Sequence, residues 1–195
     1  MHLDIIEKLI SSSKLIVELG MGDGRFLVNL AMHDNDVNST YIGIELDKQQ
    51  YEDAKTHINL RNVQIINGSF EDLVPNFPDN SIDRFIAILP DPAFIDQLKQ
   101  KKWESFYRVV YSKLKNYGSF QLVTELTDNL LQPISDKVYD KWVEWLTITF
   151  QSIGFELINK KEGAPSGYST RCIDCFRGDP ERIRLVTLDL IKKKH

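Results

Sequence analysis

The sequence has few of the side chains that build metal centres, disulfide frameworks or nucleophilic active sites. Its 195 residues include only two cysteines and four histidines. Cys172 and Cys175 form a single C-x-x-C pair, and no second pair or nearby histidine supplies the other two ligands of a tetrahedral zinc site. Two cysteines in a chain of this length also exclude a disulfide-rich secreted scaffold. We therefore expect reduced thiols, a cytoplasmic location and no metal.

Long apolar stretches are absent as well. No run approaches the roughly 20 consecutive apolar residues of a membrane span, so we expect no membrane contact. The first residues, "MHLDIIEKLISSSK", carry Asp4 and Glu7 and lack the apolar centre of a signal peptide. With 42% hydrophobic and 27% charged residues, the composition is typical of a globular chain. The length predicts a single domain over 1–195, with a short N-terminal helix over 1–13.

The charge is unevenly distributed along the chain. Residues 1–92 hold 7 basic and 15 acidic side chains, whereas residues 93–118 hold 6 basic and 2 acidic ones. Residues 156–195 hold 9 basic and 6 acidic side chains. This asymmetry favours one face that meets a polyanion, although a solvated run of surface charges would produce the same pattern. The candidate phosphate ligands are Lys99, Lys101, Lys102, Arg171, Arg177 and Arg184.

Short β-branched runs alternate with helical patterns. Strands are predicted over 14–19, 40–46, 62–67, 83–89, 119–124, 155–160 and 182–191, and helices over 24–33, 100–116 and 133–154. In the middle helix Trp103, Phe106, Val110 and Leu114 share one face as core residues, and Gly118 follows as a stop. About 20 residues without periodicity join the last two strands. The pattern predicts an α/β fold, a Rossmann-like doubly wound sheet of seven mostly parallel strands with an antiparallel last strand.

The stretch "VELGMGDGRF" (residues 17–26) combines glycine with acid. Gly20, Gly22 and Gly24 resemble the G-x-G-x-x-G dinucleotide fingerprint, but Arg25 occupies the place of its third glycine. No Gly-Lys-Ser/Thr follows, which excludes a P-loop. Glu18 stands at the entrance of the turn, where it would repel a phosphate. A cationic ligand suits this combination better.

S-adenosylmethionine is such a ligand, because it carries a sulfonium and an ammonium group and no phosphate. Glycines would let the backbone approach its amino-acid end, while Glu18 receives the ammonium group directly or through water. "YIGIELD" ends the second strand at Glu45, where a carboxylate can accept both ribose hydroxyls of an adenosine cofactor. A glycine-rich turn without a ligand is the simpler alternative.

Five stretches together resemble a known family. They are "VELGMGDGRFLVNLA", "YIGIELD", "DNSIDRFIAILPDP", "TELTDN" and "GYSTR", in this order. The most specific elements are Pro90-Asp91-Pro92 after the fourth strand and Thr127-Asp128 after the fifth. The chain resembles a class I S-adenosylmethionine-dependent methyltransferase and, more narrowly, the tRNA guanine-N7-methyltransferase family, from Lys14 onward. The family's fold is a seven-stranded sheet with a reversed last strand, in agreement with the predicted pattern.

The resemblance also implies a cofactor site. Glu18 and Glu45 would hold S-adenosylmethionine beside the glycine turn. Ser69 stands where the family usually has the acid that meets the adenine amino group, and Phe70 follows it.

On the substrate side, the resemblance implies that Asp91 lies between cofactor and base and that Asp128 binds the target guanine. Thr170, followed by Arg171, would contact cofactor or substrate from a long loop over 161–181. Lys99 and Lys102 would contact the tRNA.

The predicted chemistry agrees with the shortage of histidine and cysteine. Guanine N7 carries a lone pair and no proton, so its methylation requires alignment more than a base. Carboxylates favour a base that becomes cationic, and one carboxylate can accept guanine N1–H and N2–H together. Asp91 and Asp128 suit these two roles. As structural alternatives, Asp91 could cap a turn and Asp128 could begin the following helix.

Two other functions are compatible with the sequence. A ribosomal RNA methyltransferase, acting on adenine N1 in the manner of the aminoglycoside-resistance enzymes or on guanine N7, would share the glycine turn but generally lacks Pro-Asp-Pro and Thr-Asp. A non-enzymatic RNA-binding module on the same fold would not need an intact cofactor turn. Monomer and homodimer are both compatible with the sequence.

Overall fold

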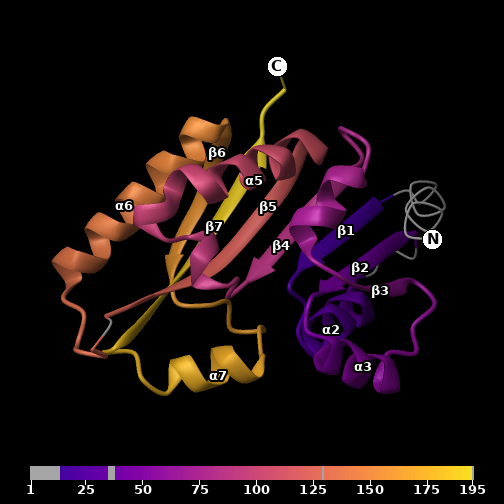
Figure 1. The fold of residues 1–195 in the computed structure, drawn as a ribbon, viewed down its shortest axis with the longest axis horizontal. Coiled ribbons are helices and arrows are strands. Elements are labelled where there is room, and N and C mark those ends of the chain that lie inside the picture. Colours follow the sequence, from indigo (N-terminus) through magenta and orange to yellow (C-terminus); the bar gives the residue numbers. More distant parts are fainter. Residues whose placement is uncertain (1–13, 35–37, 129, 195) are drawn as a thin grey trace.

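Seven strands form a single mixed sheet in the computed structural model, which describes residues 14–34, 38–128 and 130–194. The strand order is β3-β2-β1-β4-β5-β7-β6 (Figure 1). The strands are β1 (Lys14–Leu19), β2 (Ser39–Glu45), β3 (Val63–Asn67), β4 (Ile82–Ile88), β5 (Leu114–Thr127), β6 (Phe155–Glu162) and β7 (Ile183–Lys192). β7 is antiparallel to both neighbours, β5 and β6, and the other pairs are parallel. The predicted fold class is confirmed, while the expected helix over 1–13 lies outside the described residues.

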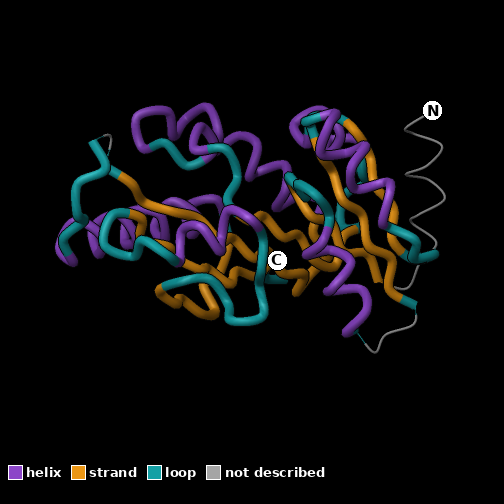
Figure 2. Tube along the Cα trace, turned by 90° about the horizontal axis from the view of Figure 1, so that it is seen from below, coloured by secondary structure: helices purple, strands orange, loops and turns teal. Residues whose placement is uncertain are grey.

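Helices flank the strands, which cross the middle of the molecule in Figure 2. They are α2 (Arg25–His33), α3 (Lys48–His57), α4 (Phe70–Leu73), α5 (Gln100–Lys113), α6 (Asp136–Ile153) and α7 (Arg171–Arg177), with short 3₁₀ turns η1 (Val74–Asn76), η2 (Pro92–Phe94) and η3 (Gln97–Lys99). Successive strand residues point to opposite faces, so the sheet builds two cores. One lies under α5 and α6, and the other lies under α2 and α7.

The larger core contains the predicted apolar face of α5, although Leu114 is the first residue of β5 and not part of the helix. Trp103, Phe106, Val110 and Leu114 are all at most 7% exposed. The indole N–H of Trp103 donates to the backbone oxygen of Asp96 at 2.8 Å, so this ring is satisfied inside the fold. These aromatic residues are therefore core residues, as predicted, and are not exposed surfaces for stacking RNA bases. Within the described residues no helix is both long and apolar enough to cross a membrane.

The prediction that Gly118 stops the helix before the fifth strand is wrong. α5 ends at Lys113, and Gly118 lies inside β5. The register of β4 and β5 shifts here, from Ile82 opposite Leu114 to Arg84 opposite Ser119. A Cβ atom on Gly118 would lie 2.9 Å from a backbone oxygen of its own strand and 3.1 Å from one of β4. Glycine is required because the backbones approach so closely in this bulge.

The expected structureless connection between the last two strands contains a helix. α7 has seven residues, and Ile173 is its deeply buried anchor in the smaller core. The helix α3 is likewise absent from the predicted elements, because Ala54 is its only buried residue. Neither segment has the repeating apolar stripe that marks a helix in sequence, so only the folded chain reveals them.

Candidate active site

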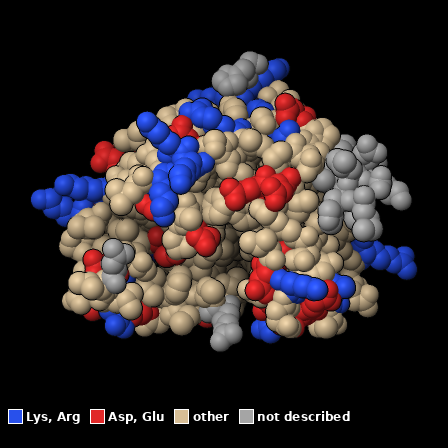
Figure 3. All heavy atoms as spheres, in the orientation of Figure 1, with Lys and Arg blue, Asp and Glu red and all other residues tan. Residues whose placement is uncertain are grey.

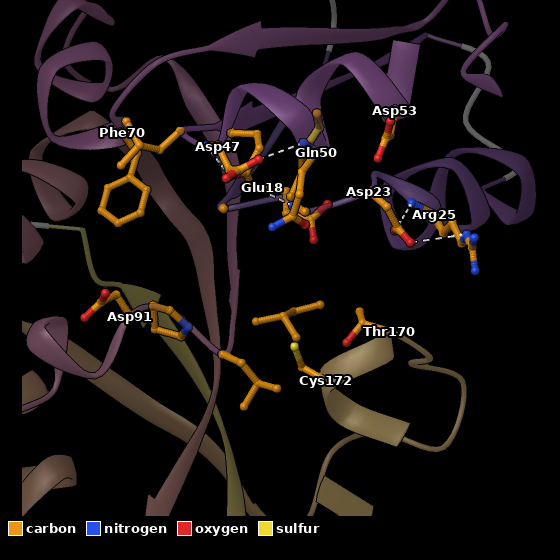
Figure 4. Close-up of a pocket in the computed structure, with 18 of the residues that line it drawn as sticks. Glu18, Asp23, Arg25, Asp47, Gln50, Asp53, Phe70, Asp91, Thr170 and Cys172 are labelled. Carbon is orange, nitrogen blue, oxygen red and sulfur yellow. Dashed lines mark hydrogen bonds and ion pairs between the residues drawn. The ribbon is translucent and has the colours of Figure 1, made fainter. Parts of the chain in front are cut away.

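A cleft of about 1810 Å³ opens at the carboxyl ends of β1, β2 and β4. In doubly wound sheets, ligands bind at this edge. Figure 4 shows the glycine turn and α3 on one wall, with Thr170, which precedes α7, and Cys172 of α7 on the opposite side. Eight predicted site residues line the cleft, namely Glu18, Gly20, Gly22, Glu45, Ser69, Phe70, Asp91 and Thr170. The fold therefore brings together residues that are more than 150 positions apart in the sequence.

The turn between β1 and α2 requires glycine for its backbone conformation. Gly20, Gly22 and Gly24 have φ values of +75°, +57° and +73°. Residues other than glycine rarely adopt this backbone conformation. The N–H groups of Gly20 and Met21 donate to the backbone oxygen of Ile44 at 2.9 and 3.0 Å, which ties the turn to β2. Gly24 does not line the cleft. It precedes α2 and packs against Ile58, where a Cβ atom would come within 2.7 Å.

Glu18 is the most buried acid of the cleft. Its side chain extends from β1 and the residue is 1% exposed. Oε2 has no hydrogen-bond partner among the described residues. Burial, together with repulsion from Asp23 and Glu45, holds the pKa of Glu18 well above its usual range. A buried acid without a partner is costly unless a ligand supplies a donor, so this position fits an ammonium group.

Glu45 ends β2 and holds the glycine turn from the other side. Its Oε2 accepts the N–H of Gly22 at 2.8 Å, and its Oε1 accepts the N–H of Asp47 at 2.7 Å. Each oxygen keeps a second lone pair, and the residue lines the cleft. The carboxylate therefore both shapes the turn and can accept a pair of ligand hydroxyl groups.

An aromatic cluster borders the cleft beyond Glu45. The Phe70 ring packs against Phe94 and Phe106, with centroid distances of 4.7 and 5.1 Å. The Ser69 hydroxyl accepts the N–H of Glu71 at 3.1 Å and thereby caps α4. This wall offers a flat apolar surface beside a polar rim, which suits a heterocyclic ring.

Asp91 lies at the end of β4, after a strained residue. Leu89 has a φ of +50°, which is costly for a residue with a side chain, and such strain gathers at functional sites. The exposed Asp91 carboxylate accepts the N–H of Ala93 at 2.8 Å and begins the turn η2. Asp91 therefore caps a turn and also lines the cleft, and its place between cofactor and base stays a prediction.

Asp128 is not brought into the cleft. It is exposed after β5, and its Oδ1 accepts the N–H groups of Leu130 at 2.8 Å and Gln132 at 3.4 Å. The alternative that it begins the following helix is wrong, since α6 starts at Asp136 and Ser135 precedes it. Asp128 therefore organises a turn at the edge of the sheet that also carries the cleft.

Of the residues predicted to contact RNA, some line the cleft and others lie on the surface away from it. Thr170 lines the cleft, and its hydroxyl accepts the N–H of Ile173 at 3.1 Å to cap α7, whose first residue is Arg171. Lys99 pairs with Asp96 at 3.2 Å, and Lys102 is exposed on α5. Neither lysine lines the cleft. Figure 3 shows acidic side chains around the central hollow and basic side chains over α5.

Arg184 is not a free phosphate ligand. Its side chain is 11% exposed and lies between Asp136 and Glu162, at 2.7 and 2.5 Å. The guanidinium also stacks over the Tyr139 ring, 4.0 Å from its centroid. This residue therefore ties β6, β7 and the start of α6 together, and the prediction that it meets RNA is not supported by its position.

Sequence reasoning assigned no role to Glu125, although it lies within "TELTDN". Its Oε2 is buried and has no partner among the described residues. Burial and the nearby Asp91 raise the pKa of Glu125 to about 7. No sequence signal marks it, because a strand position does not reveal which carboxylate the surrounding chain will desolvate.

We predict a pH-dependent stability from Glu125. Its pKa is higher folded than unfolded, so the folded state favours the protonated acid and stability is lost as pH rises through about 7. Glu125→Gln removes this loss and should stabilise the protein at pH 9 relative to wild type by up to about 3 kcal/mol. At pH 5 the difference should be small. Urea unfolding at both values measures the change, with exposed Glu144→Gln as control. A difference independent of pH would contradict the assignment.

A family whose description is "Putative methyltransferase" matches residues 12–149 of the chain. The tRNA (guanine-N(7)-)-methyltransferase of Wolbachia pipientis is 36% identical over 91 residues, which cover 45% of this chain and 40% of that protein. The protein of the same name from Campylobacter fetus is 26% identical over 168 residues, which cover 73% of this chain and 42% of that protein. The chain thus spans less than half the length of either relative.

Solved structures share the fold at low sequence identity. The 16S rRNA methyltransferase KamB superposes with a TM-score of 0.72 and 16% identity, covering 96% of this chain and 92% of that one. The 16S rRNA (adenine(1408)-N(1))-methyltransferase of Catenulisporales acidiphilia, solved with S-adenosylmethionine, gives a TM-score of 0.68 and 11% identity, covering 98% and 92%. The family match and the order of strands in the sheet both indicate a methyltransferase, and the buried Glu18 of the cleft is compatible with a cationic cofactor. The chain belongs to this S-adenosylmethionine-dependent methyltransferase family, has its class I fold, and counts tRNA (guanine-N7-)-methyltransferases among its relatives.

Proposed function

We propose that the protein methylates N7 of a guanine in tRNA, in the variable region. The observation that carries the proposal is that one cleft holds both Glu18, whose Oε2 has no partner among the described residues, and Asp91 of the Pro-Asp-Pro turn. Relatives named tRNA (guanine-N7-)-methyltransferases support the choice of substrate.

For the cofactor, we propose that Glu18 receives the ammonium group and Glu45 the ribose hydroxyls. Gly20 and Gly22 leave space beside the amino-acid end, because neither residue has a side chain. Ser69 and Phe70 border the adenine, with the ring of Phe70 packed against one face. S-adenosylmethionine, when bound, supplies a methyl group on a positively charged sulfur. Every one of these residues lines the same cleft.

The protein's task is then to align the base and to stabilise its developing charge. N7 has no proton to lose, so no general base is needed. Asp91, at the end of β4, can orient the guanine, and its negative charge favours the cationic product. Such alignment can supply roughly 7–11 kcal/mol of the barrier reduction.

For the RNA, we propose that Asp128 accepts N1–H and N2–H of the guanine. Its two turn bonds both end on Oδ1, which leaves Oδ2 for the base. Thr170 would contact the substrate or cofactor across the cleft, and Arg171, Lys99 and Lys102 would meet phosphates.

Nucleoside mass spectrometry tests the proposal. Unmodified tRNA and small ribosomal subunits are incubated separately with the protein and isotopically labelled S-adenosylmethionine, then digested. We expect labelled N7-methylguanosine in tRNA only. Labelled N1-methyladenosine or N7-methylguanosine in the ribosomal RNA alone would overturn the choice of tRNA in favour of a ribosomal substrate. Cofactor binding without label in either RNA would contradict RNA methylation itself.

A further inference from the structure

The wall of the cleft opposite the glycine turn carries two thiols. Cys172 and Cys175 are both free, both exposed and both line the cleft. They are three residues apart on α7, so they lie on the same side of the helix. Thr170 and Phe176, before and after them, line the same cleft. A chemical change at this thiol pair therefore occurs within the wall of the proposed cofactor site.

The helix that carries the thiols is anchored to the rest of the fold by a buried side chain and by hydrogen bonds at its end. Ile173, between the two cysteines, is 0% exposed and packs in the smaller core. Arg177 donates to the backbone oxygens of Tyr168 at 2.7 Å and of Pro165 at 2.6 Å, which fastens the far end. The thiols are thus presented to the cleft by a fixed element.

Closing a disulfide between these residues requires the helix to change. Cβ atoms three residues apart on an α-helix are about 5–6 Å apart, whereas a disulfide brings them to about 3.5–4.5 Å. The turn that contains both cysteines must tighten. Because Ile173 holds the buried side, the adjustment falls on the exposed side, where Thr170 and Phe176 border the cleft.

We propose that Cys172 and Cys175 are an oxidation site whose disulfide lowers the affinity of the protein for its cofactor. This inference rests on the proposed cofactor site. The oxidant class is a peroxide. One thiolate attacks the O–O bond and becomes a sulfenic acid, and the second thiol displaces water to form the S–S bond. Overall, two thiols lose two electrons and two protons, and hydrogen peroxide becomes two water molecules.

Calorimetric titration after controlled oxidation tests the inference. The whole protein is reduced, desalted, treated with limited hydrogen peroxide, quenched with catalase and titrated with S-adenosylmethionine. Intact mass should fall by two hydrogen masses with no added oxygen, and peptide mapping should join Cys172 to Cys175. We expect the dissociation constant to rise about tenfold or more, as for the loss of one or two polar contacts. Dithiothreitol should reverse the change.

Cys172→Ser and Cys175→Ser are the matched controls, because each keeps one oxidisable thiol and cannot form the ring. For each variant, the dissociation constant for S-adenosylmethionine after peroxide treatment, divided by that of the reduced protein, should remain near one. The inference is overturned if no intramolecular disulfide forms, if the oxidised protein binds equally well, or if the single variants respond as the wild type does. Reduced wild-type protein without measurable affinity would instead contradict the proposed cofactor site, and the inference with it.

Discussion

Asp91→Ala should abolish most methyl transfer while leaving cofactor binding nearly unchanged. The carboxylate lies at the end of β4 in the cleft, where it can orient the guanine and stabilise the cationic product. Removing one such preorganised group lowers the rate by on the order of 10²–10³-fold. Single-turnover transfer to tRNA measures the rate, and calorimetry measures the affinity for S-adenosylmethionine.

Asp96→Ala is a closely matched control. Like Asp91, Asp96 begins a short 3₁₀ turn, and its carboxylate accepts the N–H of Leu98 at 2.8 Å. It does not line the cleft. This variant loses the same kind of cap and frees Lys99 from its ion pair with Asp96, and it should keep the wild-type rate within a few fold. Equal losses in the two variants would show that Asp91 acts only as a cap, and the proposed role would have to be abandoned.

Glu18→Gln should produce the largest loss of cofactor affinity. The change keeps the shape of the side chain and removes the charge that we propose receives the ammonium group. Hydrogen bonds to charged groups contribute about 1.5–3 kcal/mol, so the dissociation constant for S-adenosylmethionine should rise by about 10- to 100-fold. Glu125→Gln is the control, because it also replaces a buried oxygen that has no partner in the described part of the chain, but Glu125 does not line the cleft.

The free Glu18→Gln protein should be more stable than wild type at high pH. The pKa of Glu18 is raised by burial, so its stabilising protonated form is lost as pH rises through the folded value. A cationic ligand favours the ionised acid, so wild-type binding should release protons near and below that pKa. Titrations in buffers of different ionisation enthalpy detect this release. A variant that binds as tightly as wild type, with the same proton release, would refute the assignment of Glu18.

The spacing of residues along the chain was sufficient to predict the glycine turn and the two acids on the proposed cofactor side of the cleft. Glu18, the glycine turn and Glu45 lie within 28 consecutive residues at the ends of two strands that are neighbours in the sheet. Their positions beside the cleft follow from a strand–turn–helix sequence whose backbone conformation glycine permits. For this reason the sequence predicted both the turn and the acids that border it. The alternation of strands and helices likewise predicted the sheet, because each period reflects which faces must be buried. The last strand is antiparallel as predicted, although the connection before it, expected to contain no helix, contains α7.

The sequence by itself thus determined the seven strands, the three helices α2, α5 and α6, the glycine turn and the acids beside it, since these depend on neighbours along the chain. The tertiary structure decided which charged groups are buried, paired or exposed. Arg184 is held by Asp136, 48 positions away, and Glu125 is desolvated by packing that its own segment does not encode. It also decided that α7 turns its two thiols toward a cleft formed by the other half of the chain. Burial and electrostatics depend on distances in space, and the fold brings together side chains that the sequence keeps apart.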